Sequence, residues 1–205
     1  MNTIGVNVYE GITPATNDTV FGWNSDNPIF EKLIEQTKPS CIIEVGTWLG
    51  ASAIHMAKIT KKLNLNTKIY CIDTWLGAEE FWTRFKDTPE RDLRCKNGYP
   101  QVYFDFLSNV VKHEVQDIII PIPNTSFVGS KILSHLGVRA DLIYIDGSHE
   151  YEDVKLDIVS YQGLLTPGGI MFGDDIRWEG VRKAVDENLK DRVDIIEDNH
   201  WVLKV

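Results

Sequence analysis

Residues 141–151 are D-L-I-Y-I-D-G-S-H-E-Y, and a second run, P-G-G-I-M-F-G-D-D, ends at Asp174 and Asp175. Both are apolar runs that stop at acidic residues, which is typical of a buried parallel strand whose carboxyl end opens into a functional crevice. Asp146, Asp174 and Asp175 are therefore expected at one edge of a sheet, with His149 beside them. Because three carboxylates repel one another in a small volume, the pattern predicts a hard divalent cation and a neighbouring base.

The rest of the chain alternates strand-like and helix-like segments. Short apolar runs predict strands at 41–45, 68–73, 118–122, 141–145, 170–173, 193–197 and 200–205. Helical spacing predicts helices that begin at 27–28 and that span 51–60, 103–111, 126–136, 150–164 and 180–189. This order predicts an α/β fold, a Rossmann-like doubly wound three-layer sandwich. Its seven-stranded sheet is expected to be mostly parallel, with a C-terminal antiparallel strand pair.

The chain length suits one well-buried domain, because 205 residues are too few for two comfortable ones. We assign that domain to residues 26–205. Residues 1–25 are rich in Asn, Thr, Gly and Pro, which predicts an irregular N-terminal arm or lid. Residues 74–100 are polar, aromatic and charged without a clear period, so this insertion is the expected substrate region.

Composition excludes several classes of protein. A net charge of -9 and a pI near 5.0 argue against a nucleic-acid-binding surface, which needs a basic face. Three cysteines without a CxxC motif predict neither a disulfide framework nor a zinc site. The sequence contains no signal-peptide pattern and no apolar run of ~18 residues, so we expect a cytoplasmic protein without a membrane partner.

The turn after the first predicted strand is E-V-G-T-W-L-G-A-S, from Glu44 to Ser52. A dinucleotide fingerprint would place glycines at 46, 48 and 51, but Trp and Ala occupy the last two positions. Gly46 and Gly50 alone suit a ligand with ribose and adenine but no phosphate; a plain tight turn is the alternative. Asp73 ends the second strand, where a carboxylate can accept two hydrogen bonds from a ribose diol. A helix cap is the alternative role for Asp73.

Structural roles compete with the functional ones at the acidic edge. His149 could cap a helix or bond a carbonyl, and Asp174 or Asp175 could be an ordinary helix N-cap. The pattern assigns no role to His113, His135 and His200, which we expect at peripheral positions. Arg177, just after the acidic pair, could reach an acidic substrate, although solvent exposure is the simpler expectation.

Four motifs together resemble the class I S-adenosylmethionine-dependent methyltransferases, in the macrocin O-methyltransferase-like small-molecule branch. These motifs are E-V-G-T-W-L-G-A-S, I-Y-C-I-D-T-W-L-G, D-L-I-Y-I-D-G-S-H-E-Y and G-G-I-M-F-G-D-D, and the likeness runs from about residue 38 to 190. The resemblance implies S-adenosyl-L-methionine as cofactor. It implies cofactor-binding roles for Glu44, Gly46, Thr47, Trp48, Gly50, Ser52, Asp73, Thr74, Trp75, Thr125, Ser126 and Asp146.

Within that set the resemblance also implies a division of labour. Glu44 and Gly46 would hold the methionine part, Asp73 the ribose, and Trp75 would lie beside the adenine. Thr125 and Ser126, after the third strand, would lie near the adenine ring.

The resemblance further implies a metal and a base. Asp146, Asp174 and Asp175 would bind Mg²⁺, with Mn²⁺ as the alternative ion, and His149 would be the catalytic base. Asp175 stands where the wider metal-dependent group usually has Asn. An aliphatic hydroxyl is a poor nucleophile near neutral pH, so a cation that lowers its pKa suits such an acceptor.

We therefore predict an S-adenosylmethionine-dependent, divalent-metal-assisted O-methyltransferase acting on a hydroxyl of a small molecule, such as a sugar or glycosylated metabolite. The alternatives are a cephalosporin hydroxylase-like metalloenzyme and a non-catalytic S-adenosylmethionine-binding protein. The expected partner is a hydroxylated small molecule, and homo-oligomer formation is left open.

Overall fold

The computed structural model describes residues 6–16, 20–84, 88–196 and 199–204. Its helices are α1 (Pro28–Thr37), α2 (Ala51–Lys62), α3 (Glu79–Thr83), α4 (Val102–Lys112), α5 (Ser126–His135), α6 (Tyr151–Gln162) and α7 (Glu179–Leu189), with 3₁₀ turns η1 (Pro89–Arg91) and η2 (Lys190–Arg192). Its strands are β1 (Cys41–Val45), β2 (Lys68–Asp73), β3 (Ile119–Pro123), β4 (Ala140–Ile145), β5 (Leu165–Gly173), β6 (Val193–Ile196) and β7 (His200–Lys204).

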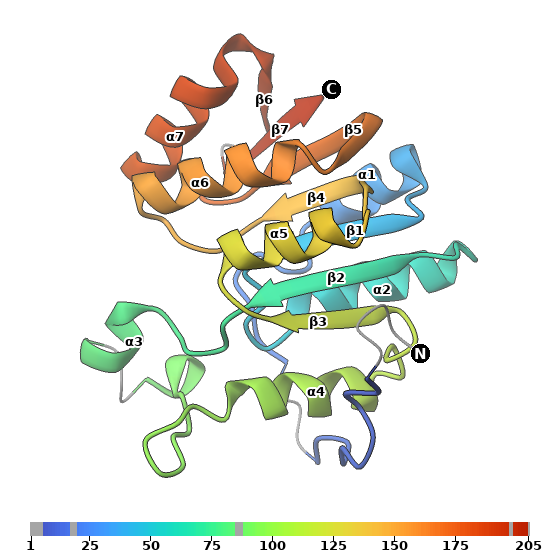
Figure 1. The fold of residues 1–205 in the computed structure, drawn as a ribbon, viewed down its shortest axis with the longest axis vertical. Helices are drawn as coiled ribbons and strands as arrows, with labels where there is room; N and C mark the ends of the chain where they lie inside the picture. Colours follow the sequence, from blue (N-terminus) through green and yellow to red (C-terminus); the bar gives the residue numbers. More distant parts are fainter. Residues whose placement is uncertain (1–5, 17–19, 85–87, 197–198, 205) are drawn as a thin grey trace.

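The strands form one seven-stranded sheet in the order β3-β2-β1-β4-β5-β7-β6 (Figure 1). The first five strands in this order are parallel, whereas β7 is antiparallel to both β5 and β6. The predicted Rossmann-like architecture with its C-terminal antiparallel pair is confirmed. The order runs outward in opposite directions from β1 and β4, so the switch point of the topology lies between these two strands.

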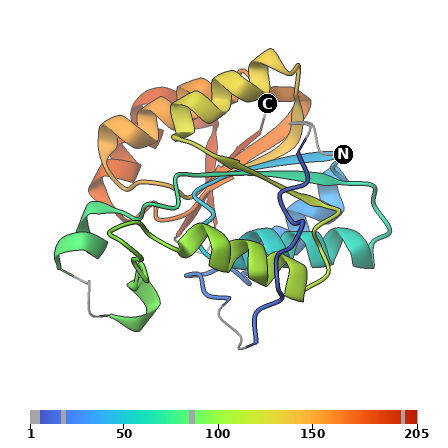
Figure 2. The same cartoon turned by 60° about the horizontal axis from the view of Figure 1, so that its bottom comes forward.

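Helices cover both faces of the sheet, as the turned view shows (Figure 2). One apolar cluster lies between the sheet and α1, α2 and α4; the other lies between the sheet and α5, α6 and α7. In the first cluster, the ring centroid of Phe30 from α1 lies 5.0 Å from that of Tyr144 and 5.6 Å from that of Phe172. Those contacts join α1 to β4 and β5. None of the described helices is long and apolar enough to span a membrane.

β5 begins five residues earlier than the predicted strand at 170. Leu165 pairs with Ala140, and the register then shifts before Leu142 pairs with Ile170. The intervening P-G-G has the composition of a turn, and Gly168 takes a positive φ of 80°. This turn-like segment lies inside β5, because the strand pairs with β4 both before and after the irregularity.

The predicted N-terminal arm contains no helix or strand in its described parts, residues 6–16 and 20–25. It packs on the first cluster through the partly buried side chains of Val8, Tyr9, Ile12, Val20 and Phe21. The Tyr9 hydroxyl also donates a hydrogen bond to the carbonyl of Ile119 at 3.0 Å. These contacts attach the arm to the domain, and the division at residue 25 stays a prediction.

We expect Phe30→Ala to lower the free energy of unfolding by about 3–5 kcal/mol, because it leaves a cavity among fully buried rings. Urea denaturation measures the change. Phe104→Ala is the matched control, since Phe104 is 50% exposed, and it should cost about 0.5 kcal/mol or less. Equal losses in the two variants would contradict this account of the core.

Candidate active site

The carboxyl ends of β1, β2, β4 and β5 meet at one edge of the sheet, where the loops that follow them lie together (Figure 1). The loop after β1 passes so close to the loop after β4 that a Cβ on Gly46 would lie 2.1 Å from the Asp146 carbonyl oxygen. Gly46 also has a φ of +86°, which favours glycine. The first glycine of the turn is therefore required by the approach of two loops as well as by its own conformation.

Glu44, at the inner end of the turn, is fully buried. Its Oε2 accepts a hydrogen bond from the Thr47 hydroxyl at 2.7 Å, and its Oε1 accepts one from the Ser52 hydroxyl at 2.6 Å. Burial raises the pKa of Glu44 to about 7, and the two hydroxyl donors oppose the rise. Both oxygens face donors of the same turn, so Glu44 holds the turn in shape and buries Thr47 and Ser52 with it.

Asp73 ends β2 and faces the turn from the other side. Its Oδ2 accepts backbone N–H hydrogen bonds from Thr47 at 2.9 Å and Trp48 at 2.8 Å, and its Oδ1 accepts one from Trp75 at 2.7 Å. Burial raises the Asp73 pKa, and these backbone donors counter the rise. The carboxylate predicted to hold a ribose thus also links the loops after β1 and β2.

Trp75 lies in the core, at 1% exposure, against the rings of Tyr103 and Phe106. Its indole N–H donates to the Trp48 carbonyl at 2.7 Å. Trp48 and Trp75 both have positive φ values, 48° and 53°, which are costly for non-glycine residues. The indole of Trp75 therefore packs in the core and bonds the backbone of the glycine turn at Trp48. Its predicted place beside the adenine stays a prediction.

The remaining predicted cofactor residues lie at the starts of helices and loops. The Thr125 side chain caps α5 by accepting from the Val128 N–H, and Gly50, at φ +87°, precedes α2. The Thr74 hydroxyl accepts from the Leu76 N–H at 3.2 Å. The Ser126 hydroxyl donates to buried Asp157 of α6. The Ser126 side chain is thus directed towards α6.

The acidic edge brings together a group that could hold a metal ion: Asp146, His149 and Asp175, with one potential ligand atom from each lying within 4.8 Å of the others. Burial, and then the charges of Asp174 and Asp175, hold the Asp146 pKa well above its usual range. The Tyr144 hydroxyl donates to Asp146 Oδ2 at 3.0 Å and counters part of this rise.

His149 precedes α6 and points its Nε2 at Asp175 Oδ2, 2.8 Å away. This hydrogen bond raises the His149 pKa, while burial lowers it. The imidazole ring stacks on Trp178, with centroids 4.8 Å apart and planes 16° from parallel. Asp175 has a strained φ of +59°. Neither acidic residue of the pair caps α7, because Trp178 occupies the N-cap position.

Asp174 lies beside the group of Asp146, His149 and Asp175 and accepts hydrogen bonds from nearby amides. Its Oδ2 accepts from the Asn24 amide at 3.0 Å, and its Oδ1 accepts from the Asn199 amide and, at 2.7 Å, from the Asp175 N–H. Among the described residues, the group that could hold a cation consists of Asp146, His149 and Asp175, and a ligand role for Asp174 stays a prediction. The amide donors to Asp174 come from the arm and from Asn199, which sequence spacing could not reveal.

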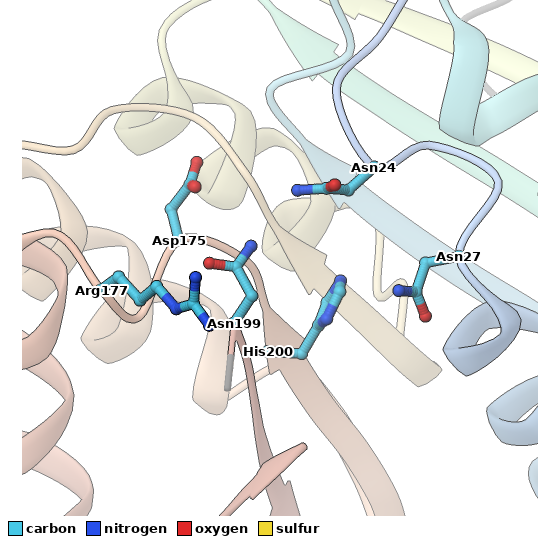
Figure 3. Close-up of a pocket in the computed structure, with 6 residues that line it drawn as sticks. All are labelled: Asn24, Asn27, Asp175, Arg177, Asn199 and His200. Carbon is cyan, nitrogen blue, oxygen red and sulfur yellow. The ribbon is translucent and has the colours of Figure 1, made fainter. Parts of the chain in front are cut away.

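A cavity of about 320 Å³ borders Asp175 and is lined by Asn24, Asn27, Asp175, Arg177, Asn199 and His200 (Figure 3). His200, expected at the periphery, is in fact 1% exposed, because β7 lies inside the sheet between β5 and β6. Arg177 is exposed, as expected, but lines the cavity. An Asn in an irregular arm and a His in a terminal strand give no local signal of this site.

Residues 43–176 match the family described as a methyltransferase domain. The chain belongs to this family. The match spans most of the sheet and the glycine turn through to the acidic pair, so the prediction of a class I S-adenosylmethionine-dependent methyltransferase is confirmed at the level of family and fold.

One curated relative of the methyltransferase is the uncharacterized protein y4gI of Sinorhizobium fredii, which is 24% identical over 153 residues. The alignment covers 75% of this chain but only 15% of that protein. The chain therefore corresponds to a small part of the relative's length.

Solved structures with the same fold include the calicheamicin methyltransferase CalS11, at 19% identity and TM-score 0.60, and the O-methyltransferase NovP, at 14% identity and TM-score 0.62. Each superposition covers 86% of this chain and 77% of the other. The O-methyltransferase of Bacillus cereus in complex with SAH matches at 14% identity and TM-score 0.59, over 99% and 89% of the two chains. These identities establish the shared fold.

The buried Glu44 gives the methyltransferase a specific pH dependence of stability. The native state keeps a proton on Glu44 up to about pH 7, whereas the unfolded chain releases it near 4.5. The free energy of unfolding should therefore fall as pH rises from 4.5 to 7. We expect Glu44→Gln to reduce this fall, by an amount on the order of 3 kcal/mol at most.

Urea denaturation at several pH values tests the prediction. Asp157, with a pKa raised to about 7, adds a slope of the same sign, so the slope should shrink without vanishing. Glu35→Gln, on the exposed face of α1, is the control and should leave the slope unchanged. An unaltered slope in Glu44→Gln would contradict the assignment.

Proposed function

We propose that the methyltransferase transfers the methyl group of S-adenosylmethionine to a hydroxyl oxygen of a small molecule, with a divalent cation beside the acceptor. The observation that carries this proposal is the cluster of Asp146, His149 and Asp175 at the same sheet edge as the glycine turn. Parallel α/β sheets bind ligands at this edge, next to the switch point of the topology.

The residues around the turn fit the cofactor. S-adenosylmethionine supplies an electrophilic methyl group on sulfur. Gly46 and Gly50 permit the tight turn between β1 and α2, and Asp73 offers a carboxylate at the end of β2 for the ribose diol. Glu44 would act on the methionine part through the turn that it shapes, because its two oxygens already accept from Thr47 and Ser52.

The residues at the acidic edge fit a divalent cation. Burial, and then the charges of Asp174 and Asp175, raise the Asp146 pKa, and a bound cation would favour its ionised form. Asp146 and Asp175 would supply oxygen ligands, which Mg²⁺ and Mn²⁺ prefer. Asp174, predicted as a third ligand, would instead position this edge through its hydrogen bonds to Asn24 and Asn199. The cation would lower the pKa of an acceptor hydroxyl and orient it.

His149 would remove the proton of the acceptor hydroxyl. Its Nε2 faces Asp175, which leaves Nδ1 as the nitrogen for a second partner. A carboxylate that orients an imidazole in this way is a recurring arrangement for general bases. The stacked Trp178 ring restricts rotation of the imidazole. The group contains one imidazole and two carboxylates, whereas non-haem iron oxygenases bind their metal with two imidazoles and one carboxylate. The ligand set therefore favours methyl transfer over hydroxylation.

The names of structural neighbours support a hydroxyl acceptor. NovP is an O-methyltransferase, and CalS11 is described as a TDP-rhamnose 3'-O-methyltransferase. A sugar or glycosylated metabolite is therefore the acceptor class that we propose for this chain.

Calorimetric titration with S-adenosylhomocysteine tests the cofactor. We expect wild type to bind it with a Kd on the order of micromolar. Asp73→Ala should weaken binding by about tenfold or more, because it removes the ribose partner and the carboxylate that accepts hydrogen bonds from three backbone N–H groups. Asp117→Ala, at an exposed acidic residue near the opposite edge, is the control and should bind as wild type does. Absence of heat from wild type, with and without Mg²⁺, would refute the cofactor.

Titration with Mn²⁺ tests the metal. Asp175→Asn and Asp146→Asn should each weaken Mn²⁺ binding by about tenfold or more, since each removes a charged ligand. The exposed Asp186→Asn should leave binding unchanged. If Asp175→Asn binds Mn²⁺ normally, Asp175 serves only to orient His149 and its assignment as a metal ligand is wrong.

A further inference from the structure

The cavity in Figure 3 adjoins the group of Asp146, His149 and Asp175 but is distinct from the glycine turn. The two features share Asp175, so a molecule in the cavity would lie against the residue that bonds His149. The lining comes from three separate parts of the chain: the arm and start of α1, the loop after β5, and the β6–β7 turn with β7. The cavity therefore exists only in the folded domain.

The buried side chain of His200 is the main evidence that this cavity binds a ligand. Its side chain projects into the cavity between Asn199 and Asn27 (Figure 3) and is 1% exposed. Neither ring nitrogen has a hydrogen-bond partner among the described residues, and Asp174 Oδ1 lies 3.6 Å from Nε2, beyond hydrogen-bond range. Buried polar groups in proteins are almost always hydrogen-bonded. The ring is therefore in position to bond a ligand.

Two further lining residues are held in fixed directions. Asp174 accepts hydrogen bonds from the amide nitrogens of Asn24 and Asn199, so the orientation of both amides is determined by one buried carboxylate. Each amide keeps its oxygen and a second N–H for another partner. Such restraint reduces the entropy that a ligand would lose by ordering these side chains.

The described residues place charges of both signs around the cavity, which favours a neutral ligand. Asp175 lines it and Asp174 lies behind the amides, while Arg177 contributes one positive charge. An anion would meet two carboxylates and a cation would meet the guanidinium. The described residues of the lining include no aliphatic side chain and no Phe, Tyr or Trp, so they offer no apolar surface against which a flat apolar ring could pack.

We infer that this cavity is the acceptor subsite and that it takes a neutral polyhydroxylated molecule through His200, Asn24 and Asn199. Amide and imidazole groups can both donate and accept hydrogen bonds, as each hydroxyl of a polyol requires. The volume of about 320 Å³ suits one small ring-sized molecule. This inference rests on the proposed function and adds the residues that recognise the acceptor.

The test is NMR titration of the full chain, labelled with ¹⁵N and saturated with S-adenosylhomocysteine and Mg²⁺. The probes are methyl glycosides of common hexoses, 6-deoxyhexoses and pentoses, with catechol and inorganic phosphate as contrasts. We expect at least one glycoside to shift the His200 ring nitrogens saturably, and catechol and phosphate to leave them in place.

Two variants establish the contacts by ligand-observed NMR. His200→Phe keeps a ring but removes both nitrogens, and Asn24→Gly removes the amide while allowing the positive φ of 52° at this position. Each should weaken glycoside binding by about tenfold, equivalent to the loss of one or two hydrogen bonds. Asn66→Ala, at an exposed position before β2, is the matched control and should bind as wild type does. If His200→Phe does not fold, Asn24→Gly still decides the question.

The outcomes separate the two proposals. If no glycoside shifts His200 while S-adenosylhomocysteine still binds, the cavity is not a polyol site and the proposed function stands. A response to phosphate or catechol alone would likewise overturn the inference. Loss of S-adenosylhomocysteine binding by wild type would instead refute the proposed function on which the inference rests.

Discussion

Buried carboxylates at the carboxyl edge of the sheet determine how this site is built. Glu44 and Asp174 are almost fully buried, and Asp73 and Asp146 lie beside them at the ends of β2 and β4. An isolated buried carboxylate is strongly unfavourable, so each must find donors or retain a proton. The hydrogen-bond donors differ among the four carboxyl groups: side-chain hydroxyls for Glu44, backbone N–H groups for Asp73, a tyrosine hydroxyl for Asp146 and side-chain amides for Asp174.

The hydrogen bonds to these carboxylates link loops that are far apart in sequence. Asp73 joins the loop after β2 to the turn after β1, and Asp174 joins the loop after β5 to the N-terminal arm and the β6–β7 turn. The close approach of Gly46 to the Asp146 carbonyl completes the arrangement. Because these links share the sheet edge, the proposed cofactor, metal and acceptor positions are built from one connected hydrogen-bonding region.

The fold could be predicted from local sequence pattern, because strands and helix starts are marked by residues only a few positions apart. The strands at 41–45 and 68–73 match β1 and β2 residue for residue, since each is a compact, mostly apolar run, the first followed by Gly46 and the second ending at Asp73. The helix start at Pro28 also agrees, because Asn27 caps it by accepting the Ile29 N–H. β5 was predicted too short, since the turn-like P-G-G within it is overridden by pairing with β4.

The doubly wound sheet, the glycine turn and the acidic strand ends could be predicted from local pattern, because they depend on residue types a few positions apart. The pairing of His149 with Asp175, the hydrogen bonds from Asn24 and Asn199 to Asp174, and the burial of His200 beside them could not. These partners are separated by 25 to 150 positions, and hydrogen bonds at such distances are set by how the elements pack. No local pattern encodes them.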